Sequence, residues 1–175
     1  MNFPILSSLI LLPTIGALFL LFSKDKNSNT GKYVALFTSF VNFLISIYLW
    51  YLFDPSTSSF QFVENREWLK GFVNYKVGID GISILFIILT TLITPLCIIS
   101  VNNTIKVRLR DFLIAILVME SLMIGVFCSL DLVVFYLFFE AGLIPMFLII
   151  GIWGGPKRVY SAFKFFLYTL LGSVL

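Results

Sequence analysis

Six apolar runs, separated by short charged segments, constrain the fold of this chain more than any other sequence feature. They occupy residues 2–23, 33–53, 79–102, 112–130, 131–153 and 160–175. Each of the first five is long enough to cross a hydrocarbon core of about 30 Å as a helix that rises about 1.5 Å per residue. Because 59% of the residues are hydrophobic and only 12% are charged, we predict an all-α, polytopic transmembrane bundle of about six helices.

The sixth run is shorter than the others. On the same helical rise it spans only about 24 Å, and it ends at Leu175 without a cap or a charged tail. We therefore interpret the chain as the N-terminal portion of a longer protein or as one half of a split one. Residues 1–175 are predicted to form a single membrane domain in which residues 54–78 form a loop.

Lysine and arginine are distributed unevenly between the two sides of the predicted bundle. Three alternate connections carry Lys24, Lys26, Lys32, Lys106, Arg108, Arg110, Lys157 and Arg158. The opposite side carries only Arg66, Lys70 and Lys76, offset by Asp54, Glu64 and Glu67. The positive-inside rule predicts that the N-terminus and the 54–78 loop face outside, and that the basic loops face the cytoplasm or matrix. This topology explains the net charge of +3, so the expected partner is the lipid bilayer and not nucleic acid.

Two glutamates, Glu120 and Glu140, lie inside the fourth and fifth runs. Both are equally far along the chain from a turn near Leu130 and Asp131, so we expect them at one level, about 14 Å from the turn and near mid-membrane. An acidic side chain there costs roughly 2.5–3.5 kcal/mol. Two carboxylates held close together do not easily both ionise, so at least one should hold a proton near neutral pH. The pattern predicts a proton-relay site, and the alternative is a buried structural pair.

A lysine, Lys164, lies two turns into the sixth run. It shares a predicted helix face with Ser161, Tyr168 and Gly172. Its long stem allows two interpretations: the ammonium reaches back to the membrane interface, or it reaches into the bundle toward Glu140.

Other polar residues in the apolar runs have structural interpretations. Asp80 and Asp131 are predicted to be N-caps of the third and fifth helices. Pro145 frees a backbone carbonyl near Glu140, which can kink the helix and admit water. A stripe at helical spacing on the third helix consists mostly of small polar residues, a pattern that is typical of helix packing in membranes or of a hydrated path. Its members are Asp80, Ser83, Ile87, Thr90, Thr94 and Cys97.

Several chemistries do not fit the composition. The chain has no histidine, which excludes histidine-ligated haem and a histidine general base. The two cysteines, Cys97 and Cys128, are isolated within predicted helices, which argues against iron–sulfur, zinc or disulfide roles. Any electron carriers are therefore expected on other chains.

Five ordered segments between residues 78 and 173 form a specific pattern. They are residues 78–83, 119–127, 139–146, 151–160 and 162–169. On these segments the chain closely resembles the antiporter-like subunits of respiratory complex I, in particular the type called subunit M in bacteria and subunit 4 in mitochondria. The resemblance implies the N-terminal portion of a fourteen-helix antiporter-like fold, located in a bacterial inner membrane or a mitochondrial inner membrane.

The same resemblance implies a function. Such subunits lie in the membrane arm of NADH:quinone oxidoreductase, beside other membrane-arm subunits, and translocate protons with redox energy released elsewhere. Glu140 matches the family's key acidic residue, which pairs with a lysine on a seventh helix beyond this sequence, and Glu120 and Lys164 match residues that modulate it or line the proton path. The NADH, FMN, iron–sulfur and quinone sites are implied on partner subunits.

Two alternatives stay open. The first is a subunit of a multicomponent cation/proton antiporter or of a membrane-bound hydrogenase, which would use the same glutamate and lysine chemistry. The second is a structural fragment that does not pump, in which the buried charges serve only the specificity of packing.

Overall fold

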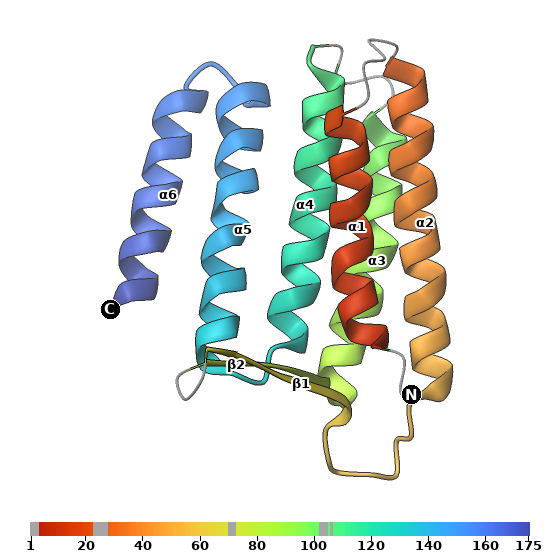
Figure 1. The fold of residues 1–175 in the computed structure, drawn as a ribbon. Helices are drawn as coiled ribbons and strands as arrows, with labels where there is room; N and C mark the ends of the chain where they lie inside the picture. The colour runs from red at the N-terminus through yellow and green to blue at the C-terminus, as the bar shows by residue number, and fades with distance from the viewer. Residues whose placement is uncertain (1–3, 23–27, 70–72, 102–104, 106) are drawn as a thin grey trace.

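In the described part of the chain, six helices run side by side and a two-stranded hairpin lies across one end of them (Figure 1). The computed structural model describes residues 4–22, 28–69, 73–101, 105 and 107–175. The elements are α1 Ile5–Phe22, α2 Ser28–Leu52, β1 Gln61–Leu69, β2 Val73–Ile79, α3 Gly81–Ser100, α4 Leu109–Cys128, α5 Leu132–Trp153 and α6 Arg158–Val174. The predicted all-α bundle is confirmed, with the hairpin as an addition.

The lengths of the helices match a bilayer. Five of them, α1 to α5, are long and apolar enough to cross a membrane. The remaining helix, α6, has 17 residues. The C-terminal ends of α1, α3 and α5 lie at the end of the bundle opposite the hairpin (Figure 1). Four of the basic residues on which the topology prediction rests, Lys24, Lys26, Lys70 and Lys106, lie outside the described residues.

The core of α1 to α4 consists of two apolar clusters with a polar layer between them. One cluster, which includes Leu6, Ile87 and Ile124, lies at the hairpin end. The other, which includes Leu20 and Leu113, lies at the opposite end. Halfway along the helices several of the buried residues are polar, and they include Asn42, Ser46, Thr91, Glu120 and Ser121. The apolar clusters therefore isolate the polar layer from both ends of the bundle.

The hairpin was not predicted, although β2 carries the signal of a strand. Val73, Tyr75, Val77 and Ile79 alternate with other residues, as expected for a strand with one buried face. The two strands are antiparallel, with Glu64 opposite Val77. The prediction of a loop over residues 54–78 does not include these strands.

The hairpin is anchored to the helices at both of its sides. The Glu64 carboxylate accepts hydrogen bonds from the backbone N–H of Leu6, at 2.9 Å, and from both the backbone and the hydroxyl of Ser7. These groups belong to the first turn of α1, whose N–H groups have no partner within the helix. The backbone N–H of Leu130 donates to the carbonyl of Lys76 at 2.9 Å. The hairpin thereby links α1 to the turn between α4 and α5.

Both predicted N-caps are confirmed. The Asp80 carboxylate accepts from the backbone N–H of Ser83 at 2.7 Å at the start of α3. The Asp131 carboxylate accepts from the N–H groups of Val133 and Val134 at the start of α5. Both caps lie at the hairpin end of the bundle.

Replacement of Asp80 by alanine should lower the free energy of unfolding by about 1 kcal/mol, the typical cost of a lost N-cap. The hydrogen bond from the Ser83 N–H holds the pKa of Asp80 below its ordinary value of 3.8. Because the folded state has the lower pKa, the stabilisation is complete above the unfolded pKa and is lost as the pH falls through the folded one. Asp80→Asn should keep the cap and lose this pH dependence. Denaturant titration of the chain in detergent, at neutral pH and below about pH 4, tests both expectations; equal pH dependence in wild type and Asp80→Asn would contradict them.

Candidate proton-transfer site

Glu120 lies in the middle of α4, within the polar layer. Its side chain is 2% exposed, and its Oε1 atom accepts a hydrogen bond of 2.9 Å from Nδ2 of Asn42 on α2. Nearby, the hydroxyls of Ser46 and Thr91 lie 2.7 Å apart and link α2 to α3. In the Asn42–Glu120 pair, the two remaining polar atoms, Asn42 Oδ1 and Glu120 Oε2, are buried and have no hydrogen-bond partner among the described residues.

Glu140 lies in the middle of α5 and faces α6. Its side chain is half-buried, and its Oε1 atom accepts a hydrogen bond from the hydroxyl of Ser173 near the end of α6. Among the described residues, no lysine or arginine forms an ion pair with it. The Glu140 carboxyl group therefore has a hydrogen-bond donor but no positive charge paired with it among the described residues, and it lies inside a helix long and apolar enough to cross a membrane.

The two glutamates do not form the pair that we expected from their spacing. Each lies eight residues from the helix end at the α4–α5 turn, but their side chains point to different helices. Phe138 of α5 contacts Gly125 of α4 and marks the surface between these helices. At about 100° per residue, Glu120 is rotated by about 140° from Gly125, and Glu140 by about 160° from Phe138. Each carboxyl group therefore points away from the α4–α5 contact.

Lys164 lies on the exposed face of α6. Its Nζ atom is 6.0 Å from the centre of the Tyr160 ring and 5.7 Å from that of Tyr168. Ser161, Tyr168 and Gly172 are also exposed, so these residues share one helix face as predicted. Glu140 instead contacts Ser173, which lies on the side of α6 that packs on α5. The structure brings Lys164 between two aromatic rings and not into contact with Glu140.

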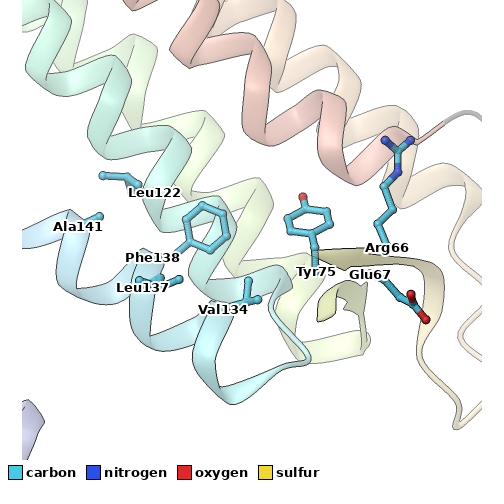
Figure 2. A pocket seen from close by; sticks show the side chains of 8 residues that line it. All are labelled: Arg66, Glu67, Tyr75, Leu122, Val134, Leu137, Phe138 and Ala141. Carbon is cyan, nitrogen blue, oxygen red and sulfur yellow. The ribbon is translucent and has the colours of Figure 1, made fainter. Parts of the chain in front are cut away.

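A pocket of about 640 Å³ lies between the hairpin and the helices α4 and α5. Figure 2 shows Tyr75, Arg66 and Glu67 of the hairpin on one side of it and apolar side chains of α4 and α5, among them Phe138, on the other. Neither Glu120 nor Glu140 lines this pocket. It is therefore separate from the candidate proton-transfer site.

The hydrogen-bond partners of both glutamates were not predicted from the sequence. Asn42 lies 78 residues before Glu120, and Ser173 lies 33 residues after Glu140. A signal for Asn42 was available, because Ser39, Asn42 and Ser46 recur at helical spacing on an otherwise apolar run and all three are fully buried. The predicted stripe on the third helix omitted Thr91, which provides the contact with α2.

Comparison with known proteins agrees with the resemblance found in the sequence. A family described as NADH:quinone oxidoreductase/Mrp antiporter, TM, matches residues 129–175. NADH-quinone oxidoreductase subunit M of Rhodobacter capsulatus is 60% identical over 151 residues, which are 86% of this chain and 28% of that protein. Subunit M of Rickettsia prowazekii is 47% identical, over 99% of this chain and 36% of that protein.

Plant and archaeal proteins extend the comparison. NADH-ubiquinone oxidoreductase chain 4 of Marchantia polymorpha is 46% identical over 97% of this chain and 34% of that protein. A chain of the archaeal membrane-bound sulfane sulfur reductase shares the fold, with a TM-score of 0.75 and 17% identity, over 95% of this chain and 25% of that chain. The present chain thus spans about a third of the length of the relatives it matches.

Proposed function

Because this chain is homologous to NADH-quinone oxidoreductase subunit M and to NADH-ubiquinone oxidoreductase chain 4, we propose that it acts in the membrane arm of a proton-pumping NADH:quinone oxidoreductase. There it translocates protons with energy from electron transfer between NADH and quinone. The observation that carries this proposal is Glu140, a half-buried carboxyl group at the middle of a membrane helix without a cation beside it among the described residues.

In the proposed mechanism, Glu140 is the group that binds and releases the proton. An approaching ammonium group stabilises the ionised carboxylate and drives the proton off, and its withdrawal favours proton uptake. Glu120 is a second relay site in the polar layer. Lys164 modulates the site from the exposed face of α6, where neighbouring parts of the assembly can reach it.

The partners and the orientation belong to the same proposal. Other membrane-arm subunits surround the chain, and the NADH, FMN, iron–sulfur and quinone sites lie on partner subunits. We place the N-terminus outside and the basic loops in the cytoplasm or matrix, in a bacterial inner membrane or a mitochondrial inner membrane. This orientation is supported by Arg108, Arg110, Lys157 and Arg158, which lie in or beside the connections opposite the hairpin.

The proposal is tested by removing the full-length gene from an organism that encodes the chain. Membrane vesicles should lose proton translocation driven by NADH, and a plasmid copy should restore it. Vesicles from the deletion strain that keep NADH-driven pumping would contradict the proposal. If those vesicles also lost cation/proton exchange driven by an imposed gradient, the antiporter alternative would replace it, a possibility raised by the family description that names both classes.

A further inference from the structure

Two buried atoms that have no hydrogen-bond partner among the described residues belong to one pair of side chains. Asn42 is fully buried and Glu120 is 2% exposed. One hydrogen bond of 2.9 Å joins Nδ2 of the amide to Oε1 of the carboxyl group. The other atom of each group, Asn42 Oδ1 and Glu120 Oε2, is the atom that has no partner in the described part of the chain.

The chemistry of these two atoms depends on a single proton. An ionised carboxylate only accepts hydrogen bonds, and so does an amide oxygen. Two acceptors cannot satisfy each other, and both would then be buried at a cost. With a proton on Oε2, the carboxylic acid can donate to Oδ1 while Oε1 still accepts from Nδ2, so that two parallel hydrogen bonds close a ring.

No charged group on the neighbouring helices offers an alternative partner. Helices α1 and α3 contain no charged residue at all. The only charged residue of α2 is Lys32, ten positions from Asn42, and the only one of α5 is Glu140, which contacts α6. On β2, Lys76 is exposed at the end of the bundle. An ionised Glu120 would therefore be buried without a counter-ion from these elements, which favours the neutral acid.

We propose that Asn42 is a positioning residue that holds Glu120 as a neutral acid in an acid–amide ring, and that this ring is a proton-storage site in the middle of α1 to α4. This role of Asn42 rests on the proposed function, in which Glu120 is the second relay carboxyl group, because Asn42 stabilises the protonated form of Glu120. Release of the proton requires the ring to open. Asn42 thereby sets how readily Glu120 exchanges its proton.

Infrared difference spectroscopy of the full-length subunit in its assembled complex tests the ring. The wild type should show a carbonyl band of a protonated carboxylic acid that is sensitive to H/D exchange, and Glu120→Gln should lose this band. Glutamine can keep both hydrogen bonds to Asn42, so this variant should assemble normally. In Asn42→Leu the band should remain but move to higher frequency, because the carboxyl carbonyl loses its donor. Asn42→Ser, which keeps a polar group in a smaller side chain, serves if Asn42→Leu does not assemble.

Ser39→Ala is the matched control. Ser39 is fully buried on the same face of α2, and its hydroxyl bonds only the carbonyl of Leu36 among the described residues. The band should keep its wild-type frequency in this variant, and the pH profile of proton pumping should shift for Asn42→Leu but not for Ser39→Ala. Identical spectra of wild type and Glu120→Gln would overturn the proposal, as would a Glu120 band that does not move in either Asn42 variant. Failure of the proposed pumping function is detected separately, because the band is measured without NADH turnover.

Discussion

Glu140→Gln should abolish NADH-driven proton translocation in membranes that contain the full-length subunit, by roughly 100-fold or more, the range for loss of a group that transfers a proton. Glutamine has the shape of glutamate, and its amide oxygen can still accept from the Ser173 hydroxyl that now bonds Oε1. Assembly should therefore persist. Proton uptake by vesicles, measured together with the amount of assembled complex, separates the loss of pumping from a loss of protein.

Glu67→Gln provides the matched control for this substitution. Glu67 is exposed on β1, outside the helices that span the membrane, so the same chemical change there should leave pumping at the wild-type level. Full proton translocation by an assembled Glu140→Gln enzyme would remove Glu140 from the mechanism. The structural alternative, in which the buried charges only specify packing, would then gain support.

The sequence predicted the helices of the described residues and the equal distance of the two glutamates from the α4–α5 turn because both follow from the lengths of the apolar runs. Asp80 and Asp131 could be identified as caps because N-caps depend on residues only a few positions away. The prediction that Glu120 and Glu140 lie close together was wrong because equal distance from the turn does not determine the angle around a helix. The Gly125 and Phe138 contact was needed to fix that angle.

The contacts that the sequence did not predict are those that join distant segments. Glu64 was counted only as a charge that offsets nearby basic residues, yet it bonds the first turn of α1, 57 and 58 residues away. Asn42 and Glu120 are separated by 78 residues. A single sequence shows that each of these groups needs a partner in an apolar setting, but the packing of the helices determines which partner it has.

Gly125→Ala should destabilise the chain by about 1–3 kcal/mol, the usual cost of overpacking a buried site. A Cβ atom at Gly125 would lie 2.5 Å from Cδ1 of Phe138 and 2.7 Å from its Cγ. The ring is attached close to the α5 backbone, so α4 and α5 must move apart to admit a methyl group. Unfolding of the purified chain in detergent by a denaturing surfactant measures the change in free energy.

Gly142→Ala gives the opposite expectation in the same pair of helices. A Cβ atom at Gly142 meets nothing within 4 Å, so the substitution should stabilise α5 by up to about 1 kcal/mol through helix propensity alone. Both substitutions replace a helical glycine by alanine, so the difference between their changes in the free energy of unfolding reports the α4–α5 contact and not the general effect of replacing glycine in a helix. If both variants stabilise the chain, Phe138 does not hold α5 against Gly125. The rotation of Glu140 toward α6 would then have to arise from the Ser173 hydrogen bond and not from the packing of α4 on α5.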